Sequence, residues 1–241
     1  MEGAHILPPL RWAGRIVADA LIEMSVRSHF RAVYARTDAV PDPSLPAIVF
    51  ANHHYWWDGY LCYILGKRWK QPLTLWMEEW RWFPPFWALG ALPYPAHNLQ
   101  ARARTVRLTL RLLQHPPRIL FLFPEGVIHA GTDLLPFGRS LHWLAQHLPQ
   151  AQLLPMAIVI SHTQHQYPRA FLRVGTPFHS AAESTEAWLA EARQVVRGMV
   201  ESLREEAECC HSPEKAQEAG YIRLVRGKCS VNERWWAKIV P

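Results

Sequence analysis

The chain has 241 residues, of which 49% are hydrophobic and 19% charged, and it contains 12 Trp. This length suffices for one α/β domain with a complete core, and so apolar and aromatic a composition excludes intrinsic disorder. The net charge of +6 and the many Trp fit a protein at a membrane surface, although an aromatic core beneath a basic surface would give the same composition. No nucleic-acid-binding motif accompanies the positive charge, so we expect no nucleic-acid partner.

Residues 10–36 predict a basic amphipathic helix, which either lies on a bilayer or packs across a sheet. We favour the bilayer. The apolar positions that recur at helical spacing are Leu10, Ala13, Ile16, Val17, Ala20, Leu21, Met24 and Phe30. The chain shows no secretory signal and no uncharged apolar run of about 18 residues, so we expect no transmembrane helix.

Apolar runs that end in polar turns alternate with helical patterns along the middle of the chain. We expect strands at residues 47–51, 72–77, 118–122, 153–160 and 170–174, and helices at 60–65, 99–114, 138–147 and 186–206. Ser184 or Thr185 would cap the last of these helices. This order predicts an α/β fold with a mixed, mostly parallel sheet flanked by helices. We divide it into an N-terminal helical segment (1–40), a main domain (41–210) and an irregular C-terminal tail (211–241).

Two further stretches are less regular. Residues 82–96 are apolar but contain four Pro, which predicts an irregular apolar surface or a re-entrant dip. Glu78 and Glu79 follow the second strand and read as the start of a helix. Four Cys, at positions 62, 209, 210 and 229, lack the spacing of a metal site or a disulfide framework, which fits a reducing compartment.

A polar turn at residues 52–58, with the sequence Asn-His-His-Tyr-Trp-Trp-Asp, follows the first expected strand. Open α/β sheets usually place their chemistry at such strand ends. If the turn folds back, Asp58 accepts a hydrogen bond from one nitrogen of His53, and the other nitrogen is free to take a proton from a hydroxyl. The alternative is a capping Asp58 and a surface His53.

A second polar turn, Phe-Pro-Glu-Gly at residues 123–126, follows the strand expected at 118–122. The first turn resembles the N-H-x-x-x-x-D motif of the glycerolipid acyltransferase superfamily, which includes the 1-acylglycerol-3-phosphate acyltransferases, and the second matches its F-P-E-G motif. The apolar runs Leu-Leu-Pro-Phe at 134–137 and Leu-Pro-Met-Ala-Ile at 154–158 also fall where this family has such segments. The resemblance covers about residues 45–180.

The resemblance implies a role for each motif residue. His53 would be the general base and Asp58 would orient it, while the second turn would bind the acceptor through Phe123, Pro124, Glu125 and Gly126. Glycine lets the backbone approach a ligand, and a carboxylate can accept a hydrogen bond from an acceptor hydroxyl or order the loop. The donor would be an acyl thioester, acyl-CoA or acyl-ACP (acyl carrier protein).

The sequence departs from the family at two positions that normally carry an Arg for the acceptor phosphate. Ala96 occupies the first, and Val127 and Ile128 follow the second motif in place of a small residue and Arg. This favours a less charged acceptor than lysophosphatidic acid, because a phosphate normally needs a guanidinium or a helix N-terminus. Alternatively, Arg102, Arg104 or Arg139 supplies the charge from a shifted position.

The sequence thus predicts an enzyme, an O-acyltransferase bound peripherally to the cytoplasmic face of a membrane. Its substrates would be a lipid-like acceptor and a thioester donor. We expect no cofactor and no metal, because a neutral imidazole base and a thiolate leaving group suffice. Residues 80–94 are a candidate wall for the acyl chain. A thioester hydrolase using the same His-Asp pair and a non-catalytic membrane-surface protein remain the rival hypotheses.

Overall fold

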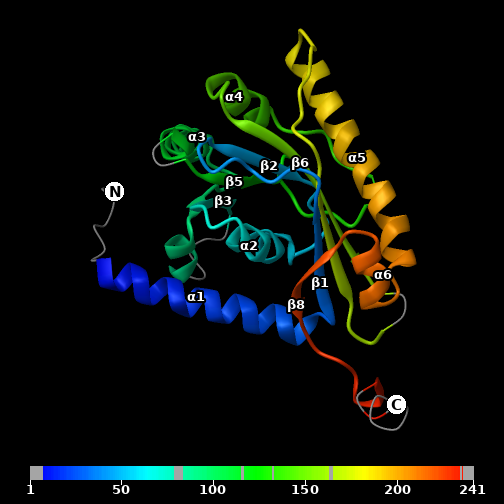
Figure 1. The fold of residues 1–241 in the computed structure, drawn as a ribbon. Helices are drawn as coiled ribbons and strands as arrows, with labels where there is room; N and C mark the ends of the chain where they lie inside the picture. The colour runs from blue at the N-terminus through cyan, green and yellow to red at the C-terminus, as the bar shows by residue number, and fades with distance from the viewer. Residues whose placement is uncertain are drawn as a thin grey trace.

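The computed structural model describes residues 8–78, 84–114, 117–131, 133–162, 165–233 and 235. Its centre is an eight-stranded sheet with the order β4-β3-β5-β2-β6-β7-β1-β8 (Figure 1). Neighbouring strands from β4 to β6 run parallel, whereas β7 is antiparallel to β6 and β8 to β1. The expected fold class, a mixed and mostly parallel sheet flanked by helices, is confirmed. The strands are β1 (Ala32–Thr37), β2 (Ala47–Ala51), β3 (Leu73–Met77), β4 (Ala91–Pro93), β5 (Ile119–Leu122), β6 (Gln152–Ser161), β7 (Arg169–Val174) and β8 (Ile222–Arg226).

Helices cover both faces of the sheet (Figure 1). The helices α1 and α2 contribute to one buried cluster, and α3, α4 and α5 contribute to the other. None of the described helices is long and apolar enough to cross a lipid bilayer. The helices are α1 (Pro8–His29), α2 (Asp58–Arg68), α3 (Leu99–Gln114), α4 (Arg139–His147), α5 (Thr185–Cys209) and α6 (Pro213–Glu218), with a 3-10 helix η2 (Pro84–Leu89).

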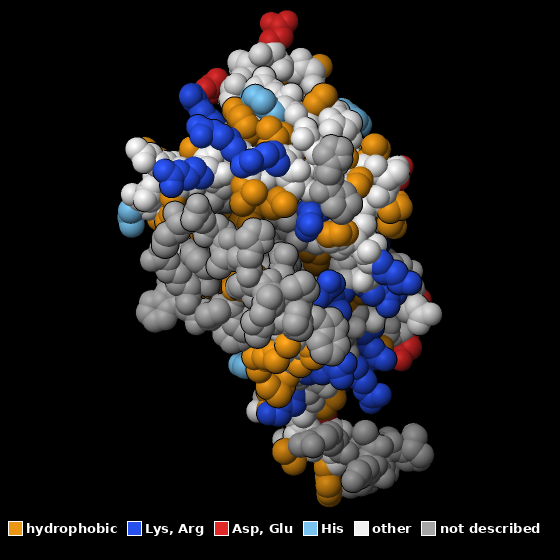
Figure 2. All heavy atoms as spheres, turned by 90° about the vertical axis from the view of Figure 1, so that its left-hand side faces the viewer, with side chains coloured by type: hydrophobic (Ala, Val, Ile, Leu, Met, Phe, Trp, Pro, Cys, Tyr) orange, Lys and Arg blue, Asp and Glu red, His pale blue; other side chains and the backbone are white. Residues whose placement is uncertain are grey.

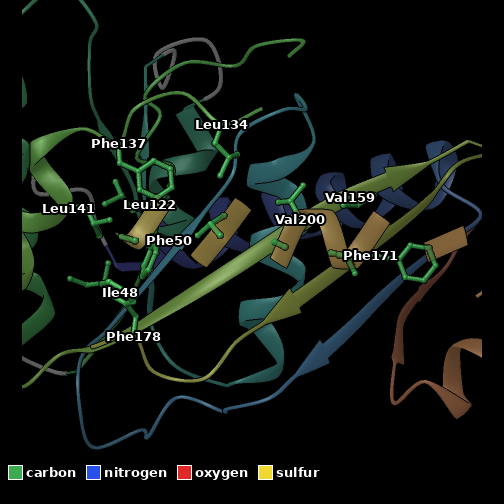
Figure 3. Close-up of a cluster of buried hydrophobic side chains, with 14 of the residues drawn as sticks. Ile48, Phe50, Leu122, Leu134, Phe137, Leu141, Val159, Phe171, Phe178 and Val200 are labelled. Carbon is green, nitrogen blue, oxygen red and sulfur yellow. The ribbon is translucent and has the colours of Figure 1, made fainter. Parts of the chain in front are cut away.

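The central strand β2 is apolar throughout because both of its faces are buried. Ile48 and Phe50 point to the cluster beneath α4 and α5, whereas Ala47, Val49 and Ala51 point to the cluster beneath α1 and α2. Alternate residues of a strand point to opposite faces of the sheet, so a strand between two helical layers needs apolar residues at every position. Figure 3 shows part of the first cluster, with Phe50 among its labelled side chains.

The N-terminal prediction was right about a helix and wrong about where the helix ends. α1 stops at His29, and residues 32–37 form β1, which pairs with β7 and β8. The buried side of α1 consists of Ala18, Ile22 and Val26, spaced four residues apart, and Phe30 directly after the helix is buried as well. Most of the apolar positions that the sequence singled out are exposed, among them Ile16, Val17 and Met24. α1 therefore packs across the sheet and still presents a second apolar side to solvent.

The expectation of an irregular tail beyond residue 210 was wrong for residues 213–226, which form α6 and β8. Ser212 caps α6 by accepting a hydrogen bond from the Lys215 N–H. β8 is an edge strand on which Arg223 and Arg226 interrupt the apolar pattern, as charged residues commonly do on sheet edges. The division into three segments stays a prediction, but both outer segments contribute a strand to the sheet.

The proline-rich apolar stretch at 82–96 is more regular than expected where the structure describes it. It contains η2 and the short parallel strand β4, joined by Gly90 at φ +96°. Its first two residues, together with Glu79 and the beginning of the proposed acyl-chain wall, lie outside the described residues. Glu78 lies in a turn at the end of β3.

Candidate active site

The two motif turns meet because β2 and β5 are neighbouring parallel strands. Val49 pairs with Phe121 and Phe50 with Leu122. The two strands therefore end at the same edge of the sheet and nearly in register. A crevice at the carboxyl ends of parallel strands is the usual location of ligand sites in such sheets.

Asn52 anchors the first turn to the sheet. Its side chain is fully buried, accepts a hydrogen bond from the Ile158 N–H at 2.8 Å and donates one to the Ile158 carbonyl at 3.0 Å. The amide therefore copies the pairing of a backbone peptide and extends the contact of β2 with β6 by one residue. No local pattern in the sequence indicates this contact, because the partner of Asn52 is more than 100 residues away.

His53 and Asp58 form the pair that the sequence predicted. His53 Nδ1 lies 2.9 Å from Asp58 Oδ2, and that oxygen also accepts a hydrogen bond from the Tyr55 N–H at 3.0 Å. The Asp58 side chain is inaccessible to solvent, whereas His53 is partly exposed. Burial raises the pKa of Asp58, although the hydrogen bonds from His53 and Tyr55 oppose the rise. Asp58 is also the first residue of α2, so the turn is closed at the start of that helix.

Glu125 joins the second turn to the first. Its carboxylate accepts hydrogen bonds from the N–H groups of His53 and Leu135, each at 2.7 Å, and Oε2 also lies 2.6 Å from His129 Nε2. The side chain has no solvent exposure. Of the two roles weighed from the sequence, this geometry corresponds to ordering the loop, because both oxygens are already bonded to protein groups.

The other residues of the second turn shape the surroundings of His53. The Phe123 ring stacks on the His53 ring, with centroids 4.2 Å apart and planes 11° apart. The Pro124 carbonyl accepts a hydrogen bond from the Gly138 N–H at 2.7 Å, which ties the turn to the start of α4. Gly126 has φ +76°, a conformation that favours glycine, and its N–H bonds to the Phe123 carbonyl to close the turn.

His54 and His129 belong to the same group of contacts, and the sequence analysis missed both. Their rings lie 4.8 Å apart, and the His129 N–H bonds to the His53 carbonyl at 3.4 Å. Burial is the main reason why the pKa of His54 is lowered. The spacing of His129, four residues after the motif Glu, is visible in the sequence but is uninformative without the fold of the loop.

The three candidate cations have different surroundings in the structure. The Arg139 guanidinium pairs with Glu186 at 2.7 Å and its side chain is 81% exposed, so these contacts do not bring it to the His-Asp pair. Arg104 is exposed on α3. Arg102 lies over the Tyr94 ring, 4.5 Å from its centroid, and donates a hydrogen bond to the Ala96 carbonyl at 3.4 Å.

A buried carboxylate bonded to a partly exposed His at the strand-end edge of an α/β sheet is a geometry that suits general base catalysis. A sequence comparison identifies the family of the chain. The chain belongs to the acyltransferase family, whose sequence model matches residues 31–159, more than half of its length.

Comparison with solved structures supports the same assignment at the level of the fold. The 1-acyl-sn-glycerophosphate acyltransferase PlsC from Thermotoga maritima superposes with a TM-score of 0.54 at 20% sequence identity, over 82% of this chain and 84% of that one. No curated protein gives a significant sequence match. The family model confirms the expectation of an acyltransferase, and the likeness to PlsC confirms the fold that the resemblance implied.

Proposed function

We propose that the protein is a membrane-associated O-acyltransferase that moves an acyl chain from a thioester donor to a hydroxyl of a lipid-like acceptor, with His53 as the general base. The observation that carries this proposal is the 2.9 Å contact between His53 Nδ1 and the buried Asp58 carboxylate. A carboxylate accepts hydrogen bonds, so Nδ1 carries the proton and Nε2 is the basic nitrogen.

The reaction needs only a base, an acceptor and a good leaving group. His53 Nε2 removes the proton of the acceptor hydroxyl as its oxygen attacks the thioester carbonyl. The resulting tetrahedral oxyanion collapses, the carbon–sulfur bond breaks, and the proton on the imidazolium passes to the departing thiolate. Asp58 stabilises the imidazolium that forms between the two steps, as in Ser-His-Asp triads. No cofactor takes part, and acyl-CoA and acyl-ACP are both suitable donors.

We infer the chemical class of the acceptor from the residues at the two positions where the family resemblance implies Arg. One is Ala96, and Val127 and Ile128 at the other are both at least half exposed. A surface of this kind favours a hydroxyl on a molecule without a phosphate next to it, such as a glycolipid or an isoprenoid glycoside. This acceptor class is our first candidate.

A phosphate-bearing acceptor is the second candidate, and Arg102 is the observation that favours it. Its guanidinium donates to the carbonyl of Ala96, beside the position that lacks the Arg. The Tyr94 ring beneath it also stacks on Trp76, so this cation lies on a supported aromatic surface. Arg102 would then replace the missing charge from the first turn of α3.

A membrane surface, on its cytoplasmic face, is the proposed location of the reaction. α1 exposes Ile16, Val17 and Met24, and the site turns expose Trp56 together with Val127 and Ile128. Figure 2 shows Lys and Arg side chains next to hydrophobic ones on the face that carries the start of α1. Apolar side chains among cations suit an interface with anionic lipids.

The test of the transferase is thiol release from an acyl-CoA by wild type and by His53→Ala, over acceptors with and without phosphate. Release that requires an acceptor and is lost in the variant supports the proposal, and the preferred acceptor separates the two candidate classes. Release without acceptor would favour a hydrolase, and equal rates in both proteins would remove His53 from the mechanism. If phosphate acceptors are used, Arg102→Leu should raise their KM and leave uncharged acceptors unaffected.

The membrane location is tested separately by flotation with anionic phospholipid vesicles. The double variant Ile16→Asn, Met24→Asn should bind these vesicles less than wild type. Val40→Asn, which removes another exposed apolar side chain away from α1, is the matched control. Equal flotation of all three proteins would refute a role for α1 at the membrane.

A further inference from the structure

His54, Glu125 and His129 bring one potential ligand atom each to within 4.8 Å of one another. His54 belongs to the first motif turn, Glu125 to the second, and His129 lies three residues beyond the second. The pairing of β2 with β5 brings the two turns together in space. Among the described residues this is the one such group of His, Cys, Asp and Glu side chains. We propose that it is a binding site for a divalent transition metal ion of the Zn²⁺ type.

The chemistry of the three ligands selects the kind of ion. Two imidazoles and one carboxylate form a ligand set that Zn²⁺ uses when a fourth position is open to water. Mg²⁺ and Ca²⁺ prefer oxygen ligands, and soft monovalent ions prefer sulfur. The site should therefore bind Zn²⁺ or Co²⁺ and should not bind Mg²⁺.

An unused nitrogen supports the assignment. His54 Nε2 is buried, and within the described part of the chain it has no hydrogen-bond partner. Most buried polar atoms in folded proteins are paired, so an unpaired one next to a carboxylate and a second imidazole needs an explanation. An ion held by the three side chains supplies one.

The site needs only small movements to close around an ion. Metal–ligand bonds of about 2.0–2.2 Å place tetrahedral ligand atoms roughly 3.3 Å apart. The Glu125 and His129 atoms, now 2.6 Å apart, would separate slightly, and His54 would approach them.

Binding also has a cost. Both imidazoles must carry their proton on Nδ1 to bind metal through Nε2. In the structure His54 Nδ1 lies 3.4 Å from the Asn52 amide nitrogen, and His129 Nδ1 accepts from the Gly131 N–H at 3.3 Å. Both contacts are longer than ordinary hydrogen bonds. Placing the ring proton on Nδ1 of each His therefore loses only weak hydrogen bonds at these two positions.

An ion here would tie the two turns together beside the proposed base. Glu125 would keep the oxygen that accepts from the His53 N–H and offer the other to the metal. We assign the ion no step in acyl transfer. The inference is therefore independent of the proposed function, and its test contains no acyl donor.

The experiment is equilibrium dialysis of the purified full-length protein against Zn²⁺, with Co²⁺ absorption spectra as a second readout and Mg²⁺ as the negative control. We expect one Zn²⁺ per chain and Co²⁺ bands in the visible range. His129→Gln and His54→Gln should each weaken Zn²⁺ binding at least tenfold, because only two of the three protein ligands remain.

The matched control is the double variant Cys209→Ser, His211→Gln, which removes a thiol and an imidazole that lie two positions apart in the sequence, outside the proposed site. It should bind like wild type. Circular dichroism and metal-free thermal unfolding check that each variant folds. If His54→Gln does not fold, the result for His129→Gln decides the test. Absence of stoichiometric Zn²⁺ binding to wild type, or unchanged binding in folded His129→Gln, overturns the proposal.

Discussion

The carboxylate of Glu125 accepts a hydrogen bond from the backbone N–H of His53 at 2.7 Å. One strand-end turn thereby holds the backbone of His53, the residue of the other turn that we propose as the base. This hydrogen bond depends on β2 and β5 ending side by side. It places Glu125 against the backbone of His53 and not against its imidazole ring.

Glu125→Gln should lower kcat by about 10–100-fold, the loss expected when a reacting group shifts by about an ångström. Three donors converge on the carboxylate, and an amide offers them only one oxygen, so its NH2 group must face at least one N–H. The measurement is steady-state kinetics with the acceptor found by the thiol-release assay, together with circular dichroism. A variant with intact kcat and a raised acceptor KM would contradict this positioning role and indicate direct contact with the acceptor.

Asp58→Asn should lower kcat by about 10³–10⁴-fold without unfolding the protein. The amide cannot stabilise the imidazolium, and it also allows the wrong tautomer of His53 to form. Single-turnover thiol release measures the effect on chemistry. Asp42→Asn, at an exposed Asp in the turn before β2, is the control and should leave the rate unchanged. Similar rates for wild type and Asp58→Asn would show that the contact between His53 and Asp58 is not needed for the reaction.

Two glycines with positive φ should respond differently to alanine. A Cβ at Gly126 would meet nothing within 4 Å, so Gly126→Ala should cost only the backbone term, about 1–2 kcal/mol. A Cβ at Gly90 would lie 2.0 Å from the Leu73 carbonyl oxygen, so Gly90→Ala must displace β3 from β4 and should cost more. Urea unfolding of both variants checks the order, and a greater loss in Gly126→Ala would contradict it.

Glu206 should make the stability of the protein depend on pH in the acid range. Burial alone would raise the pKa of Glu206, but the hydrogen bond from Tyr221 and the charges of Arg36 and Arg173 outweigh it, and the pKa is lowered. A lowered pKa in the folded state means that the stabilisation is complete above the ordinary glutamate pKa, about 4.3, and is lost as the pH falls through the folded value.

Glu206→Gln should therefore reduce the free energy of unfolding at pH 7 by about 1–3 kcal/mol, and the difference from wild type should shrink as the pH falls below about 4. Urea unfolding from pH 7 to pH 3 measures both effects. Glu205→Gln, at the exposed neighbouring position on α5, is the matched control. A difference that stays constant with pH would show that the Glu206 charge is not responsible.

The sequence by itself determined the elements whose residues all favour one structure. β2 and β5 are short, continuous apolar runs with polar turns behind them, and α5 has both a Ser184 cap and a buried apolar stripe. The motif spacing also gave the His53–Asp58 contact, because both residues lie in one turn and their meeting is a local matter.

Only the tertiary structure decided the contacts between distant segments. The pairing of Asn52 with Ile158, the three donors to Glu125 and the addition of β8 to the sheet each join residues far apart in the chain, and no local pattern encodes such partners. The same holds for α1, whose two apolar sides are indistinguishable in sequence. The sheet buries one of them, and the other is left to face solvent or a membrane.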